Sequence, residues 1–416
     1  MSTSLKITRE NGGIKPAMVS RDGVSGILMY MPQRFLPVAQ NSANGFTTDN
    51  RVIKIGTLEQ AEGLGIVSDA QRTVQSTQEP NYYVRSLWYH LREVFRINPS
   101  VELWVGVFNM PGVKDFAEIK QMQAKANGEI RQMGVYLPGN PPVSEDGMIP
   151  ETIEFEKQDV MQLQAVASVL ENEDMPLSIV YCADIQNVAQ MENCTGKGNR
   201  NVSILVGQEA DENSYAYKLY KDWGKPVGSI GTAIGIISQA SVQECIANVG
   251  KFDTQISVAG LIDGRKYSDL TISERESMEE KRLLFFKTYP GYSGVYFNDS
   301  YTQDVESSDY NSIERMRTMD KAARGVRVNL LPLVGANIKI DSESGKIDAT
   351  DIKVMENEAQ RYLEYMEKRG ELSGYKAVID SEQNILSTSE LEVVIKQVPM
   401  GVMRKINVKM GFAQKV

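Results

Sequence analysis

The sequence predicts an α/β fold, in mixed α+β form, with several domains and extended strand-forming arms at both ends. The chain has 416 residues, which are too many for one simple core. Strand-like and helix-like periodicities alternate along its middle, and this favours mixed sheets with parallel pairs flanked by helices. The last residues alternate apolar and polar side chains almost to the end, where chains are usually frayed.

The first hundred residues begin with a polar stretch and continue into strand and helix patterns. Residues 1–20 contain one short β-like piece, SLKIT, and are expected to form an extended arm. A strand is predicted over 24–31, and the stretch NRVIKIGTLEQAEGLGI predicts a strand and a short helix that ends at glycine. An amphipathic helix over 84–97 should stop near Asn98 and lead into a β-rich run over 100–109.

The middle of the chain repeats this alternation. The stretches DFAEIKQMQAKANGEIRQM and DVMQLQAVASVLENED predict helices, and GVYLP, PLSIVYCAD and 201–208 predict strands. Residues 213–250 should be mainly helical. Thr271 and Glu274 have the spacing of a helix capping box, and Pro290-Gly291 should form the turn of a hairpin.

The last third predicts two helices and several strands. One helix spans 310–325, and a second one, TDIKVMENEAQRYLEYMEKRG, should end at Gly370. The stretch ANIKIDSESGKID has a polar β pattern with a turn, while YKAVID and 391–398 predict strands. A final strand is expected over 402–412, after the break at Pro399.

Composition excludes several classes of function. The net charge of −9 argues against nucleic-acid binding by general electrostatics. No apolar run is long enough to insert into a membrane. The first residues have no apolar segment of the kind found in a secretory signal, so we expect a protein that is cytoplasmic or assembles in the cytoplasm.

The residues needed for common catalytic sites are scarce. His90 is the single histidine, and Cys182, Cys194 and Cys245 have neither disulfide-framework nor zinc-site spacing. Lys197 stands in the glycine-bearing stretch NCTGKGNRN, which precedes a strand and lacks the serine or threonine of a phosphate loop. The sequence therefore predicts no enzyme, no catalytic residue, no cofactor and no metal.

Two stretches are candidates for contacts with other proteins. On the helix over 310–325, Arg317, Lys321 and Arg324 share one face. This face is either an ordinary solvated side or a basic stripe that touches an acidic partner.

The terminal strand also has two interpretations. Its apolar side consists of Ile406, Val408, Met410 and Phe412. The strand either folds back as a hairpin on 391–398 or adds to the sheet of another subunit. Pro399 in the turn and a second isolated β piece, with Leu5 and Ile7, favour addition to another subunit.

The order and character of these segments resemble contractile tail sheath proteins, in the divergent form found in prophages. The resemblance rests on the N-terminal arm, GVSGILMYM with TLEQAEGLG, a helix leading into NPSVELWVGVF, and KTYPGYSGVYFNDSYT before SIERMRTMDKAARGVRVNLLPLVG. The resemblance also includes the alternating apolar and polar residues after a Pro/Gly break near the C-terminus, and it is weakest over 110–260. No sheath motif is catalytic.

The resemblance implies the organisation of the chain. It implies an arm over 1–20, an outer α/β region over 21–285, a C-terminal sheath core over 286–398 and a C-terminal arm over 399–416.

The resemblance also implies a structural subunit of a virion tail or contractile particle. Subunits would form hexameric rings stacked around an inner tail tube, with baseplate and tail terminator proteins at the ends. Both arms would pair with strands of neighbouring subunits, and Arg317, Lys321 and Arg324 become the candidate tube contact. Two alternatives stay open, namely an α/β ligand-binding protein or enzyme, and a baseplate or scaffold ring protein.

Overall fold

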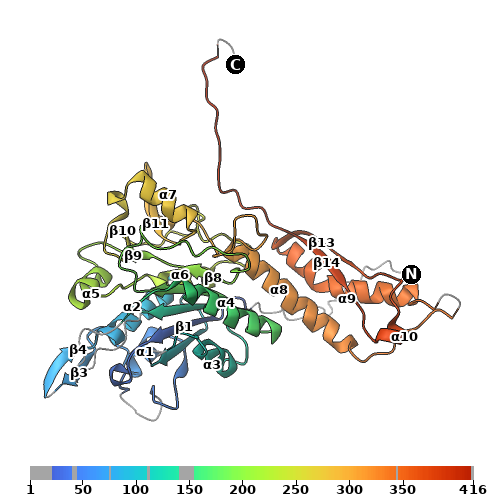
Figure 1. Cartoon of the computed structure of the whole chain (residues 1–416), viewed down its shortest axis with the longest axis horizontal. Helices are drawn as coiled ribbons and strands as arrows, with labels where there is room; N and C mark the ends of the chain where they lie inside the picture. The colour runs from blue at the N-terminus through green and yellow to red at the C-terminus, as the bar shows by residue number, and fades with distance from the viewer. Residues whose placement is uncertain are drawn as a thin grey trace, which may run out of the picture.

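The computed structural model describes residues 21–39, 45–74, 76–109, 113–139, 154–342 and 345–413. Figure 1 shows a broad α/β body, a helical region that extends from one side of it, and a C-terminal segment that runs away from both. The main hydrophobic core belongs to the body and includes residues from Val24 to Ile313. Two smaller apolar clusters lie in the helical region, around Leu363 and Met355.

A six-stranded sheet forms the centre of the body. Its order is β2-β5-β1-β6-β7-β8, and all neighbours are parallel except β2, which pairs antiparallel with β5 at one edge. Every residue of β1, β6 and β7 is buried, as expected for parallel strands covered on both faces. The strands are β1 (Ser25–Tyr30), β2 (Val52–Ile55), β5 (Leu103–Phe108), β6 (Gln132–Leu137), β7 (Ser178–Ala183) and β8 (Val202–Ile204).

Helices cover both faces of this sheet. Helix α6 packs on β6 beside Gly134, and α3 packs on the opposite face beside Gly106. Helix α2 crosses α6 where a side chain at Gly231 would meet the backbone of His90, so the glycine permits a close approach. The helices of the body are α1 (Leu58–Gly63), α2 (Tyr82–Ile97), α3 (Glu118–Lys125), α4 (Lys157–Asn172), α5 (Tyr215–Trp223), α6 (Ile230–Gln239) and α7 (Ile272–Glu280).

Three two-stranded ribbons complete the body. Strand β9 (Gly207–Glu209) pairs with β10 (Ala259–Leu261), and β11 (Phe286–Tyr289) pairs with β12 (Tyr292–Phe297). The third ribbon joins β3 (Gln71–Val74) to β4 (Thr77–Pro80) and projects from the body (Figure 1). Short 3-10 turns are η1 (Gln33–Phe35) and η3 (Tyr267–Asp269).

The C-terminal region consists of helices and one small sheet. Helix α8 (Ile313–Leu330) leads through η4 (Leu331–Leu333) to α9 (Ala349–Lys368), and α9 packs on both α8 and β13. Strand β13 (Leu372–Val378) pairs antiparallel with β14 (Val394–Pro399), and α10 (Ile385–Thr388) lies in their connection. Gly325 on α8 touches the ring of Tyr362 on α9, which brings the two helices close together.

Most predicted elements are present, and the differences are local. The helix expected over 310–325 continues to Leu330, and the single strand expected over 201–208 is divided between β8 and β9 in two sheets. The β3–β4 ribbon was not predicted. Residues 400–413 form no helix or strand in the structure, although they were expected to contain the last strand. The predicted domain boundaries stay a prediction.

Candidate functional site

The described part of the C-terminal arm beyond β14, residues 400–413, is the most exposed apolar segment that the structure describes. Figure 1 shows that it leaves the helical region and runs out past the body. Ile406, Val408, Met410 and Phe412 are 69%, 73%, 93% and 112% exposed relative to the reference for each residue type. Beyond Arg404, the arm has no hydrogen bond or ion pair with the described part of the chain. Four apolar side chains are therefore exposed, without a partner among the residues that the structure describes.

Arg404 fastens the start of this arm to the body. Its Nε donates to both carboxylate oxygens of Asp299, at 2.9 and 3.0 Å. Its Nη2 donates to Glu314 Oε1 at 2.6 Å and to Ser300 Oγ at 3.1 Å. Because the Nε and Nη2 atoms of the guanidinium are both hydrogen-bonded, the position and the direction of the Arg404 side chain are restrained.

The residues that receive Arg404 form a buried acidic socket, which consists of Asp299, Ser300 and Glu314. Asp299 is 8% exposed and Glu314 is 3% exposed, and Ser300 Oγ donates to Glu314 Oε2 at 2.5 Å. Burial alone would lower the pKa of Arg404, but the Glu314 and Asp299 carboxylates raise it. Arg404 therefore stays charged and neutralises two carboxylates that would otherwise repel each other.

The sheet β13–β14 offers strand edges that have no partner in the described structure. The sheet has two strands, so each of them has one edge without a neighbouring strand. Its inner face packs toward the helices through Tyr375 and Ile395. Val378, Val394 and Val398 are exposed. Two-stranded sheets are marginal alone, and this one can accept further strands.

The predicted basic stripe on the helix 310–325 does not form a solvent-facing surface. Lys321 is 2% exposed and lies between Asp22 at 2.7 Å and Glu371 at 2.8 Å. Arg317 is 4% exposed and donates to the carbonyl of Ala240 at 3.1 Å, and burial lowers its pKa to about 10.

The expectation of a basic contact face was therefore wrong for Arg317 and Lys321. It rested on the spacing of the charges along one helix. The groups that bind these side chains come from distant parts of the chain, and they are a backbone carbonyl for Arg317 and two carboxylates for Lys321. The contact of Arg317, Lys321 and Arg324 with the inner tube stays a prediction, although it was based on an exposed face and Arg317 and Lys321 are buried.

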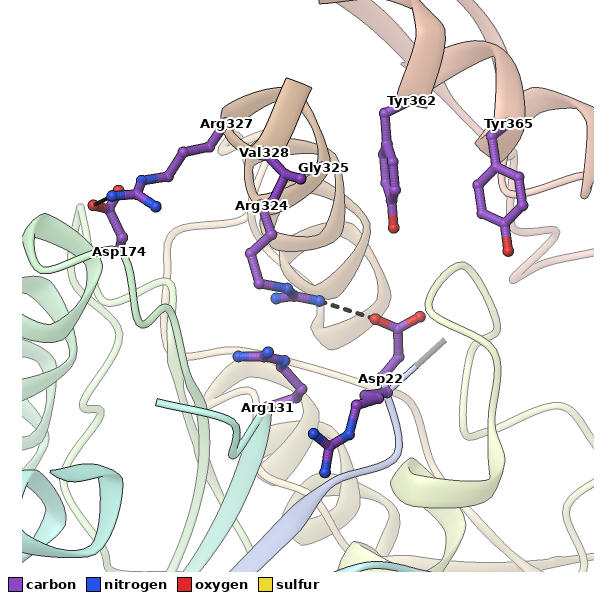
Figure 2. A pocket seen from close by; sticks show the side chains of 10 residues that line it. Asp22, Arg131, Asp174, Arg324, Gly325, Arg327, Val328, Tyr362 and Tyr365 are labelled. Carbon is purple, nitrogen blue, oxygen red and sulfur yellow. Dashed lines mark hydrogen bonds and ion pairs between the residues drawn. The ribbon is translucent and has the colours of Figure 1, made fainter. Parts of the chain in front are cut away.

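Arg324, the third member of the stripe, borders a cavity between the body and α8. The cavity has a volume of about 290 Å³, and Figure 2 shows Arg324 directed at Asp22 with Arg131 beside it. The distance from Arg324 Nη2 to Asp22 Oδ1 is 2.9 Å. On the outer side, Arg327 pairs with Asp174 at 2.6 Å. These pairs join the helical region to the body.

The other predicted contact residues lie outside what the structure can place. Leu5 and Ile7 of the N-terminal arm are not among the described residues. The sequence analysis missed Asp299, Glu314, Asp22 and Glu371, the acidic partners of Arg404 and Lys321. A signal for Arg404 existed in the sequence, since it interrupts the alternation of the arm, but its partners are about 90 and 105 residues away.

The described residues also show how the candidate catalytic groups lie. His90 is buried, and burial lowers its pKa to about 3. Cys182, Cys194 and Cys245 are buried and free, and burial raises the pKa of each thiol. Within the described ranges, no three histidine, cysteine or acidic side chains group as metal ligands. No helix there is long and apolar enough to cross a membrane.

Comparison with protein families identifies two domains in the chain. Residues 147–301 match the N-terminal domain of the DUF2586 family, and residues 309–416 match its C-terminal domain. Together these matches cover more than half of the chain. A curated relative, the putative tail sheath protein of Haemophilus phage HP1 (strain HP1c1), is 43% identical over 61 residues. That match covers 15% of this chain and only 16% of the relative.

Solved structures of contractile particles have a similar fold over the whole chain. The contracted helical sheath of the anti-feeding prophage (AFP) gives a TM-score of 0.59 at 13% identity, covering 100% of both chains. A chain of the six-fold symmetrised AFP baseplate also gives 0.59 at 13% identity, covering 99% of this chain and 100% of that one. The contracted sheath of the extracellular contractile injection system PVC gives 0.55 at 10% identity, covering 99% of both.

These matches agree with the architecture described above, a mixed α/β body followed by a helical C-terminal region and an extended arm. The chain belongs to the DUF2586 family and has the fold of contractile tail sheath proteins, as the sequence resemblance predicted.

Proposed function

We propose that this protein is a structural subunit of a contractile tail sheath. Subunits assemble in the host cytoplasm as stacked hexameric rings around an inner tail tube, between a baseplate and a tail terminator. Contraction of the sheath drives the tube through a target envelope. The proposal is supported by the similarity of the whole chain to contracted sheath structures and by the DUF2586 match.

The observation that carries the proposal is the unpartnered C-terminal arm. An isolated protein gains nothing from four exposed apolar side chains on an extended segment, and such a segment promotes aggregation. An assembly gains a connection, because a strand added to a sheet contributes main-chain hydrogen bonds as well as apolar contacts. We therefore assign Ile406, Val408, Met410 and Phe412 to strand exchange between subunits.

The same subunit supplies a surface that such an arm can join. Among the described residues, the sheet β13–β14 has two strand edges without a partner, and β13 and β14 have seven and six residues. Residues 405–412 in extended form reach about 26 Å, enough to pair along a strand of this length. The N-terminal arm with Leu5 and Ile7 is proposed to join the same sheet of another subunit.

Strand exchange also suits a particle that contracts. Contraction requires subunits to rotate relative to one another without separating. An arm that pairs with a neighbour through its outer part and hinges near Gly401 maintains the connection during rotation. Connections of this kind need neither a nucleotide nor a metal.

Electron microscopy of two versions of the chain tests this proposal. The first is the full chain, and the second ends at Lys405, so that it keeps β14 and the Arg404 contacts and loses the apolar arm. We expect hollow tubes from the full chain and soluble single subunits from the shortened one. Tubes from both versions would contradict the role of the arm. If neither version assembles with its purified inner tube as a template, the sheath proposal is wrong.

A baseplate ring protein of the same kind of particle is a second candidate function. The observation that favours it is the equal similarity to a chain of the six-fold symmetrised AFP baseplate. A ring protein would form closed rings of fixed size, whereas a sheath protein forms tubes of variable length. The same micrographs distinguish the two, since rings that never stack would support the baseplate role.

A further inference from the structure

We infer that Arg404, held in the acidic socket, prevents the C-terminal arm from folding back on its own subunit and so reserves the terminal strand for another copy of the chain. This inference rests on the proposed strand exchange and names the residue that selects the partner. Arg404 is a positioning residue, since it acts on the arm and does not itself belong to the apolar face.

Pairing of the arm with β14 of its own subunit competes with strand exchange between subunits. One edge of β14 has no neighbouring strand within the described part of the chain, and the arm follows β14 after Pro399, Met400 and Gly401. A three-residue loop is a common hairpin connection, so the arm could cover its own β14. The local concentration of the arm at its own sheet is in the millimolar range, which favours pairing within the subunit over pairing between subunits.

The contacts along α8 show that the chain continues forward after β14. Ile395 packs against the cluster that contains Ala322, and Gln397 Nε2 lies 2.9 Å from Met319 Sδ. Arg404 then reaches Glu314, which is closer to the N-terminus of α8. A hairpin would return residue 404 to a position beside Lys396. Figure 1 agrees, since the chain runs from β14 towards the body before it turns outward.

The socket has the properties of a permanent anchor. Asp299 follows β12 and Glu314 lies in the first turn of α8, so the two carboxylates lie where the body meets the start of α8. Their burial makes an empty socket costly, because two carboxylates would remain without a cation. Arg282 lies nearby, but it donates to the carbonyl oxygens of Thr302 and Asn311. Of these two guanidinium groups, only that of Arg404 bonds to both carboxylates.

Disulfide trapping in the full chain tests whether Arg404 prevents self-pairing. In a hairpin with Pro399-Met400-Gly401 as its loop, residue 406 lies opposite residue 394. Val394 and Ile406 are both exposed, and the three native cysteines are buried. The pair Val394→Cys and Ile406→Cys is introduced into the natural chain and into Arg404→Gln. Oxidation is followed on dilute subunits, where non-reducing gels separate internal cross-links from links between subunits.

We expect the internal cross-link to form at least fivefold faster in Arg404→Gln than with Arg404 present. Arg361→Gln is the matched control, since Arg361 pairs with Glu358 on the exposed surface of α9 and should leave the rate unchanged. A triple variant, Arg404→Gln with Asp299→Asn and Glu314→Gln, covers the case in which the emptied socket unfolds the subunit. It removes the buried charges and should cross-link as fast as Arg404→Gln.

Equal cross-linking rates in all folded variants would overturn the inference, as would rapid internal cross-linking with Arg404 present. These rates do not depend on assembly. If the full chain forms no tubes but the rates differ as expected, the proposed function fails and the restraint by Arg404 stands. If tubes form from Arg404→Gln as readily as from the natural chain and the rates are equal, exchange stands and the inference about Arg404 fails.

Discussion

At the scale of single residues, ion pairs with at least one buried member join parts of the chain that are far apart in sequence. Lys321 touches both Asp22 and Glu371, and Arg404 touches both Asp299 and Glu314. Buried ion pairs contribute little net stability, but breaking one of them leaves an uncompensated charge. Such contacts therefore determine which segments lie together more than they determine how stable the subunit is.

Asp320 on α8 should make the stability of the subunit depend on pH. The side chain is 6% exposed, and burial raises its pKa to about 7, although Arg324 acts in the opposite direction. Its folded pKa is thus above the ordinary value of 3.8. The folded state holds this proton more tightly, so the stabilisation is complete below pH 4 and is lost as the pH rises to about 7.

We therefore expect Asp320→Asn to gain stability relative to the natural chain as the pH rises from 5 to 8. Urea unfolding at both pH values measures this difference. His90 has a pKa lowered to about 3 by burial, and this makes stability rise with pH, but it is present in both proteins and cancels. A difference between the two proteins that does not change with pH would contradict the prediction.

Gly325 should tolerate no side chain. An added Cβ would lie 1.8 Å from a ring carbon of Tyr362, so Gly325→Ala must push α8 and α9 apart. We expect a loss of about 1–3 kcal/mol in the free energy of unfolding, measured with urea. Gly63→Ala in α1 is the matched control, because no atom lies within 4 Å of its added Cβ. Equal losses in the free energy of unfolding for the two substitutions would contradict the close packing of α8 on α9.

At the scale of elements, periodicity predicts most of the helices and strands, because each depends on its own residues. The capping box of α7, with Thr271 and Glu274, and the turn between β11 and β12 at Pro290-Gly291 were predicted and are present. The β3–β4 ribbon was missed because QRTV and TQEP are polar and lack strand alternation. Arg317 and Lys321 of α8 were expected on a contact face but are buried, because helical spacing does not reveal which segments pack against a helix.

The strand predicted over 402–412 shows the limit of what a local sequence pattern can predict. Alternation over 402–412 predicts a strand, but a strand needs a neighbour, and the single subunit supplies none in the structure. Similarly, the spacing of Arg404 in the arm does not identify Asp299 or Glu314, because their meeting depends on the tertiary fold. The geometry of the paired strand and the long-range ion contacts could therefore not be predicted from sequence.

The two sides of the arm should differ in their importance. Serine at Ile406, Val408, Met410 and Phe412 should abolish assembly and leave the thermal unfolding of single subunits unchanged, because these side chains are exposed there. Serine at Lys405, Asn407 and Lys409, on the other side, should leave assembly intact. Sedimentation of assembled material measures both outcomes. Normal assembly of the apolar-face variant would show that the arm does not join a neighbour through that face.

At the scale of the whole molecule, the chain combines a well-packed body with a loosely covered C-terminal region. The main core extends through the central sheet and the β9–β10 and β11–β12 ribbons, whereas the two clusters around Leu363 and Met355 are small. A two-stranded sheet with free edges becomes more stable when further strands join it. Strands added during assembly would therefore stabilise the C-terminal region. The core of the body, in contrast, consists of residues of the same subunit.

A cryo-electron microscopy reconstruction of the assembled full chain tests this account most directly. The measurement is the path of the chain from Arg404 to Phe412. We predict that Arg404 stays in the socket of its own subunit and that residues 406–412 form a strand in the β13–β14 sheet of a neighbouring subunit. An arm that turns after Pro399 and pairs with β14 of its own subunit would contradict the account.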